Sequence, residues 1–106
     1  MKFFKGDENM IMVTAKITAK SGERDNIIAK AQDLITSSRL DSGCISYNLY
    51  ASTENEDVLL MFEQWENFEL LQSHMQTEHF KAFGTATGDI LAGEIDIRVY
   101  SAEIKN

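Results

Sequence analysis

The side chains best suited to chemistry gather in one stretch of the chain, residues 62–83. This stretch contains the single tryptophan, Trp65, both histidines, His74 and His79, and four of the six phenylalanines. Aromatic rings can hold a flat organic molecule, and an imidazole can accept or donate a proton near neutral pH. The stretch therefore predicts a site for an aromatic ligand at which a proton is moved.

His74 lies in the apolar stripe of a predicted helix. At about 100° per residue, its side chain falls between those of Leu70 and Leu71. Burial in an apolar setting disfavours the imidazolium, so the pKa of His74 is expected to fall and the ring to be neutral at pH 7. A neutral imidazole can accept a proton, which makes His74 a candidate base. A buried structural histidine with a satisfied hydrogen bond is an equally open interpretation.

His79 falls near the start of the next predicted helix, one turn before Phe83. The positive end of the helix dipole disfavours its charged form. The side chains of His79 and Phe83 can share the rim of a cavity, but a solvated histidine at a helix end is the favoured interpretation of His79. Phe83 is expected in the core or on a cavity wall.

Glu63 and Trp65 share one face of a predicted strand. A carboxylate on this apolar face is either a base or an orienting group for a histidine, or it pairs with Arg98 or Lys16 across the sheet. The ion pair is slightly favoured. Tyr47 lies on an apolar strand face, and its hydroxyl needs a partner if it is buried.

Several other kinds of site lack support in the sequence. His74 and His79 are five residues apart, which is the wrong spacing for two ligands on one helix face, and no third ligand stands near them, so no metal site is expected. The glycines form no phosphate-binding loop and no flavin or nicotinamide fingerprint. Cys44 has no neighbouring histidine to activate it as a nucleophile.

The elements that must position these residues follow from the spacing of apolar side chains. Alternation predicts strands over residues 10–18, 44–52, 57–65 and 94–103, and a helical stripe predicts a helix that follows a cap at Ser21 and ends near Leu40. Asn67 and Thr77 are predicted to cap two further helices, ending near residues 76 and 91. The order β-α-β-β-α-β predicts a ferredoxin-like α+β domain over residues 10–106, after a short arm over residues 1–9.

The third predicted strand is apolar on both faces. Val58, Leu60 and Phe62 alternate with Leu59 and Met61. A sheet covered by helices on one side only is expected to alternate apolar with polar residues. We therefore expect the second face to be covered by another copy of the chain, which gives a homodimer.

Composition limits the partners and the compartment. The 106 residues carry a formal net charge of −7, which argues against nucleic acid and against an anionic membrane surface. No apolar run reaches the roughly 20 residues that span a bilayer, and no signal peptide is expected at the N-terminus. A single cysteine forms no internal disulfide, so a cytoplasmic location is the simplest expectation.

Three segments resemble the antibiotic biosynthesis monooxygenase domain, and within it the small quinol monooxygenases. They are Ser42–Tyr47 (SGCISY), Glu63–Glu66 (EQWE) and Leu71–Phe83 (LQSHMQTEHFKAF). The resemblance covers about residues 10–102. It implies a dimeric α+β barrel with a cavity in each subunit. It also implies oxygenation of a small aromatic substrate, a quinol or phenol, by O₂ without metal, flavin or other cofactor.

The resemblance also implies roles for individual residues. His74 is the expected base, supported by Glu63, and Trp65 completes the expected catalytic group as a positioning donor. The expected substrate-binding residues are Tyr47, Met61, His79 and Phe83.

Two other functions stay open. Haem-degrading relatives carry a ligating histidine where this chain has Gly84, which disfavours haem. An isomerase that acts on a small signalling carbonyl compound also needs a histidine that shuttles protons. The same dimeric scaffold serves as a non-catalytic ligand-binding or stress-response module, and the fold alone does not distinguish these functions.

Overall fold

Four strands and three helices make up the part of the chain that the structure, a computed structural model, describes, residues 9–106. The predicted arm over residues 1–9 lies, apart from Asn9, outside these described residues. In chain order the elements are β1 (Met10–Thr18), α1 (Arg24–Ser38), β2 (Cys44–Ala51), β3 (Val58–Trp65), α2 (Phe68–Met75), α3 (Glu78–Thr87) and β4 (Asp96–Ala102).

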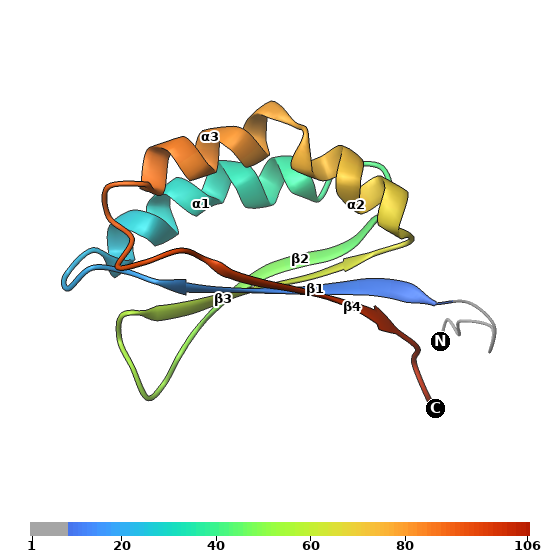
Figure 1. Ribbon diagram of the computed structural model, residues 1–106, viewed down its shortest axis with the longest axis horizontal. Coiled ribbons are helices and arrows are strands. Elements are labelled where there is room, and N and C mark those ends of the chain that lie inside the picture. The colour runs from blue at the N-terminus through green and yellow to red at the C-terminus, as the bar shows by residue number, and fades with distance from the viewer. Residues whose placement is uncertain (1–8) are drawn as a thin grey trace.

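The strands form one antiparallel sheet in the order β2-β3-β1-β4, with all three helices on one face (Figure 1). This arrangement confirms the predicted ferredoxin-like fold. The predicted caps of α2 and α3 are also confirmed, since Asn67 Oδ1 accepts from the Leu70 amide and Thr77 Oγ1 from the Phe80 amide.

Two predicted helix ends are wrong. Helix α1 begins at Arg24 after Glu23, with no side-chain cap, so Ser21 does not cap it. Helix α3 ends at Thr87 and not near Leu91. Glycines at positions 84 and 88 weaken the helix there, and Leu91 instead forms a bridge to Ala19 at the end of β1.

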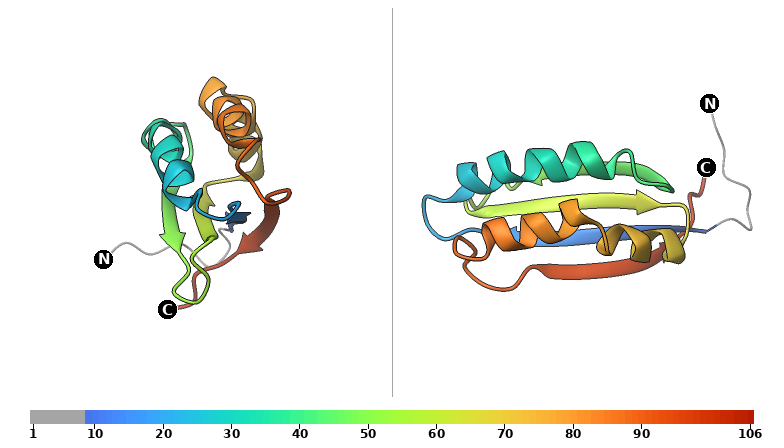
Figure 2. Two further views of the ribbon diagram at one scale, coloured as in Figure 1. Left: turned by 90° about the vertical axis from the view of Figure 1, so that its left-hand side faces the viewer. Right: turned by 90° about the horizontal axis from the view of Figure 1, so that it is seen from above.

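The core lies between the helices and the sheet. On β3, Leu59, Met61, Glu63 and Trp65 point towards the helices and are buried, whereas Val58 and its alternating neighbours on the opposite face are half-buried. The helices leave that opposite face bare (Figure 2, left). Among the described residues, no helix has the length and apolar composition that crossing a bilayer requires.

Strand β4 lies at the edge of the sheet, where the helical layer gives little cover (Figure 2, right). Ile97 and Val99 pair with Ala15 and Val13 and so face the helical side, yet they remain 49% and 45% exposed. The space between sheet and helices is therefore open towards solvent along β4.

Candidate functional site

A chamber of about 100 Å³ lies between the sheet and the helices. Its walls are mostly apolar and draw on every strand and helix of the domain, with Met61 and Phe83 among the apolar side chains. The polar side chains that line it are Tyr47, Glu63 and His74. An apolar enclosure with a few converging polar groups is the usual form of a small-molecule site.

His74 lies at the end of α2 and is only 1% exposed. Three aromatic rings surround its imidazole, with centroids 4.6 Å away for Trp65, 5.3 Å for Phe80 and 5.4 Å for Tyr47. Burial lowers the pKa of His74, although the hydrogen bond and charge of Asp41 oppose this effect. The neutral ring is therefore favoured, as the sequence predicted.

The two nitrogens of His74 have different surroundings. Nδ1 lies 2.8 Å from Oδ2 of Asp41, whereas Nε2 is buried and has no hydrogen-bond partner among the described residues. A carboxylate only accepts hydrogen bonds, so Asp41 holds the proton of a neutral His74 on Nδ1. The lone pair then lies on Nε2, the form of the ring that can take a proton from a ligand.

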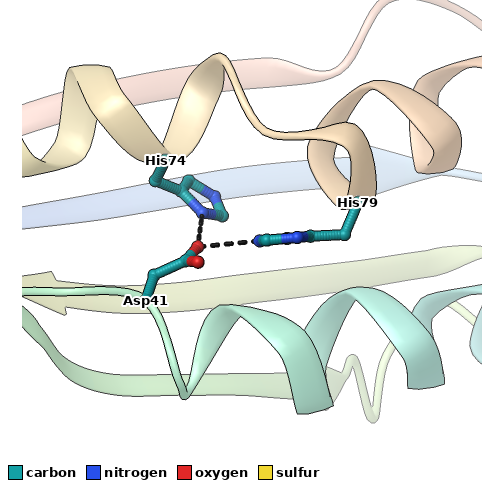
Figure 3. A group of neighbouring side chains, drawn as sticks. All are labelled: Asp41, His74 and His79. Carbon is teal, nitrogen blue, oxygen red and sulfur yellow. Dashed lines mark hydrogen bonds and ion pairs between the residues drawn. The ribbon is translucent and has the colours of Figure 1, made fainter.

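Asp41 binds His79 through the same oxygen. Nε2 of His79 lies 2.8 Å from Asp41 Oδ2, and Figure 3 shows the two rings converging on this atom from different helices. The side chains of Asp41 and His79 are 18% and 22% exposed. We call Asp41, His74 and His79 the Asp–His–His cluster.

Local backbone contacts fix the position of Asp41. Its amide donates to Ser38 O and its carbonyl accepts from the Cys44 amide, so both ends of the turn are bonded. Gly43 completes the turn with φ of +81°. A Cβ on Gly43 would come within 2.8 Å of Leu70 Cβ, so only glycine allows the turn to lie directly against α2.

Thr77 fixes the two histidines relative to each other. Its amide and its hydroxyl both donate to the carbonyl oxygen of His74, and the same hydroxyl caps α3. The link makes a tight connection between α2 and α3, so that His79 follows His74 closely in space although it belongs to another helix.

Glu63 is a buried carboxyl group on the wall of the chamber. Its Oε1 accepts from Trp65 Nε1 at 3.0 Å, and burial raises its pKa to about 7 against the opposing hydrogen bonds of Trp65 and Tyr47. The favoured alternative from the sequence, an ion pair with Arg98 or Lys16, is wrong. Arg98 pairs with Asp96, and both Arg98 and Lys16 lie on the other face of the sheet from Glu63.

Tyr47 and Cys44 also keep their protons. Burial, followed by the charge of Glu63, raises the pKa of Tyr47, so its phenol remains a neutral donor in the chamber. The same two causes, in the same order, raise the pKa of Cys44 to about 11. The thiolate is thus disfavoured, in keeping with the weak support for Cys44 as a nucleophile.

The structure brings together only some of the predicted site residues. Tyr47, Met61, Glu63, His74 and Phe83 line the chamber. Trp65 lies behind the chamber, fully buried, with its indole N–H directed to Glu63 rather than into the cavity. His79, one of the substrate-binding residues that the resemblance implied, does not line the chamber and instead binds Asp41.

Asp41 is the residue that sequence reasoning missed. The family resemblance implied that Glu63 supports His74, but Glu63 binds Trp65 and the partner of His74 is Asp41. The expectation that no third ligand group lies near the two histidines is also wrong. Asp41 stands in a loop 33 residues before His74, and no periodicity links the two positions.

The fold and site define an α+β domain with room for a small apolar molecule beside a histidine. The chain matches the family described as "Antibiotic biosynthesis monooxygenase" over residues 10–86, and it belongs to this family. The relationship that the sequence motifs suggested is therefore confirmed.

Individual relatives agree with this assignment. The chain is 35% identical to the uncharacterized protein sll1783 of Synechocystis over 96 residues, which are 91% of the chain and 65% of that protein. It is 29% identical to the "Probable quinol monooxygenase YgiN" of Escherichia coli K12, with 85% of the chain and 95% of YgiN covered. A conserved protein from Methanosarcina mazei has a similar crystal structure, with a TM-score of 0.83, 29% identity and coverage of 88% and 92%. The family match and the relationship to YgiN support a monooxygenase-type function.

Proposed function

We propose that the protein is a cofactor-independent monooxygenase that oxidises a quinol or phenol with O₂, with Nε2 of His74 as the proton acceptor. One observation carries the proposal. Nε2 is buried in an aromatic surrounding with no partner among the described residues, while Asp41 holds Nδ1. An unpaired buried acceptor costs free energy, and a ligand hydroxyl would satisfy it.

The chemistry needs little beyond this nitrogen. When His74 takes the hydroxyl proton, the resulting phenolate gives up an electron to O₂ far more readily than the neutral phenol does. For a hydroquinone, one oxygen atom enters the ring and the other leaves as water, so that hydroquinone and O₂ give a hydroxyquinone and water. General base catalysis of this kind raises the reaction rate about 10²- to 10⁴-fold.

Glu63 and Tyr47 suit the binding of the substrate oxygens. With a pKa of about 7, Glu63 is partly protonated at neutral pH and can then donate a hydrogen bond from the chamber wall. Tyr47 is a neutral phenol whose O–H is bonded to Glu63 and whose oxygen can accept a hydrogen bond from a substrate hydroxyl. Met61 and Phe83 supply the apolar walls. Trp65 holds Glu63 through its indole N–H, so its role is to position that carboxyl group.

The size of the chamber favours a small aromatic ring. An engineered cavity of about 150 Å³ in another protein binds benzene. The chamber here holds about 100 Å³ and is open along β4, beside Ile97 and Val99. A single ring can fill the enclosed part while its substituents extend towards this opening.

A homodimer forms part of the proposal. The bare face of the sheet carries Met12, Leu60, Phe62 and Tyr100, which are half-buried or exposed in the single chain. Packing this face against its copy would remove the apolar surface from water. The pairing would agree with the dimeric α+β barrel that the sequence motifs imply.

Oxygen uptake with a panel of hydroquinones and phenols tests the function, with heat-treated protein as the background control. The parent is expected to consume oxygen and release a quinone, and His74→Gln is expected to lose about 10²-fold or more in kcat. A His74→Gln protein that is folded and as fast as the parent would remove the proposal. Proton exchange at a carbonyl substrate without oxygen uptake would indicate an isomerase, and binding without either reaction would indicate a ligand-binding module.

A further inference from the structure

The Asp–His–His cluster has a feature that proton transfer from a quinol does not require. A single hydrogen bond from His74 Nδ1 to Asp41 is enough to fix the tautomer of His74, yet His79 also converges on the same oxygen. One ligand atom of each of the three side chains lies within 4.8 Å of the others, and they come from three different parts of the chain.

We propose that Asp41, His74 and His79 form a binding site for a divalent transition-metal ion such as Zn²⁺. Two imidazoles and a carboxylate are ligands that zinc, cobalt, nickel and ferrous iron accept. The site uses Oδ2 of Asp41, Nδ1 of His74 and Nε2 of His79, and the ion takes the place of the hydrogen-bonded protons between them.

The distances fit such an ion. Ligand atoms bound at about 2.0–2.1 Å and separated by angles between octahedral and tetrahedral values lie roughly 2.8–3.4 Å from each other. Both nitrogens of the cluster lie 2.8 Å from Asp41 Oδ2. The two nitrogens are already within 4.8 Å, and His79 is partly exposed, so a modest rotation of its side chain completes the set.

Access and charge also favour a cation. Asp41 and His79 reach solvent, which gives the ion an entrance and leaves a position for water, whereas His74 is buried behind them. The chain carries a formal net charge of −7, which attracts cations to its surface. Because Asp41 and His79 are partly exposed and His74 is buried, the ion would lie on the solvent side of His74, opposite the chamber.

The ion would change what His74 presents to the chamber. Coordination through Nδ1 leaves the single proton of the neutral ring on Nε2, because the other nitrogen is now bound to metal. Nε2 then donates a hydrogen bond and no longer accepts a proton. This consequence rests on the proposed function: metal binding converts the base into a donor and inhibits oxidation of the quinol.

Metal binding is measured directly, without activity. Titration of the untagged protein with ZnCl₂ in a calorimeter, and with CoCl₂ followed by visible absorption, is expected to give one ion per chain. His79→Gln and Asp41→Asn are each expected to weaken the affinity at least 10-fold. The chain has only two histidines, and Cys44→Ser tests whether the thiol contributes, with unchanged binding expected. Absence of binding by the parent overturns the inference. Variants His79→Gln and Asp41→Asn that bind the ion as tightly as the parent also overturn it.

Oxygen uptake then separates this inference from the proposed function. Zn²⁺ is expected to inhibit the parent at the concentrations that saturate the site in calorimetry. For His79→Gln, inhibition is measured relative to its own metal-free rate, and the same degree of inhibition is expected to require at least 10-fold more Zn²⁺. If Zn²⁺ saturates the site without inhibiting oxygen uptake, metal binding does not convert His74 from a base into a donor. Metal binding by a protein that oxidises no quinol would leave the metal site standing and remove the proposed function.

Discussion

His74 and Asp41 are joined by a hydrogen bond of 2.8 Å between Nδ1 and Oδ2, although 33 residues separate them in the chain. The bond crosses from the turn after α1 to the end of α2. It gives the buried ring a defined orientation, with Nε2 directed away from Asp41 and left without a partner among the described residues. The geometry is that of a histidine whose tautomer is set by a carboxylate, an arrangement that enzymes use to prepare a base.

Asp41→Asn is the first test of this relationship. Asparagine keeps the shape but loses the charge, and a hydrogen bond to a charged group contributes about 1.5–3 kcal/mol. We expect kcat for quinol oxidation to fall about 10- to 100-fold with KM little changed, because Asp41 positions the base and does not line the chamber. Steady-state oxygen uptake gives both constants.

The matched control is Asp89→Asn, which removes an equal charge from an exposed position beyond α3. It is expected to keep the parent values of kcat and KM. An Asp41→Asn protein with parental kcat would show that the hydrogen bond does not matter for the reaction. A rise in KM as large as the loss in kcat would instead indicate a distorted chamber.

Gly43→Ala tests the turn that carries Asp41. The substitution forces a side chain into φ of +81° and places its Cβ against Leu70. A left-handed conformation costs about 1–2 kcal/mol and overpacking about 1–3 kcal/mol. We expect a loss of roughly 2–5 kcal/mol in the free energy of unfolding, measured by urea denaturation.

Gly22→Ala is the control for the backbone contribution alone. Gly22 has φ of +82°, but a Cβ there has nothing within 4 Å, so the expected loss is about 1–2 kcal/mol. Leu70→Ala removes the Cδ1 and Cγ contacts of the Gly43→Ala Cβ but keeps the Leu70 Cβ at 2.8 Å, so in the double variant the excess over Gly22→Ala is expected to shrink in part, relative to Leu70→Ala alone. Equal losses for Gly43→Ala and Gly22→Ala would show that the contact with Leu70 carries no energy.

The sequence predicted the strands and the caps of α2 and α3 because these depend on near neighbours. Alternating apolar residues in β1 and the side chains of Asn67 and Thr77 act within a few positions of the chain. The ends of α1 and α3 were less predictable. At the end of α3, a bridge between Leu91 and Ala19 competes with helix formation, and this contact joins segments far apart in sequence.

The site was predictable where one element alone decides a position. The apolar stripe of α2 correctly indicated that His74 is buried, and the strand pattern placed Glu63 and Trp65 together. The partner of each group depends on tertiary packing. Asp41 meets His74 only because Gly43 lets its turn approach Leu70, and His79 joins them only because Thr77 connects α2 to α3 tightly.

Phe62→Glu tests the proposed dimer. Phe62 lies on the bare face of the sheet, on the middle of β3. A buried uncompensated charge costs about 3–5 kcal/mol, so the dissociation constant of the dimer is expected to rise at least about 100-fold. Sedimentation velocity at micromolar concentration is expected to show a dimer for the parent and a monomer for the variant.

Leu40→Glu controls for the added charge, because Leu40 is 84% exposed in the turn between α1 and β2 and belongs to no strand of the sheet. It is expected to remain dimeric. A parent that sediments as a stable monomer of 12.0 kDa at the same concentration would contradict the dimer itself.

Glu63→Gln tests the protonation of the chamber wall. Burial raises the pKa of Glu63 from 4.5 to about 7, so the folded state holds this proton more tightly than the unfolded chain does. The contribution to stability is therefore fully present below pH 4.5 and is lost as the pH rises through 7. The loss amounts to roughly 3 kcal/mol, since each pKa unit corresponds to about 1.4 kcal/mol.

Glutamine has no group that titrates between pH 4.5 and pH 8, so the free energy of unfolding of Glu63→Gln is expected to change less with pH in this range. The difference between parent and variant, measured by urea denaturation from pH 4.5 to pH 8, isolates the contribution of Glu63 from that of other groups. Glu54→Gln, in the exposed loop before β3, is expected to follow the parent. Parallel curves for the parent and Glu63→Gln would contradict the raised pKa. The raised pKa also predicts that quinol oxidation slows above about pH 7, because an ionised Glu63 repels the phenolate that His74 creates.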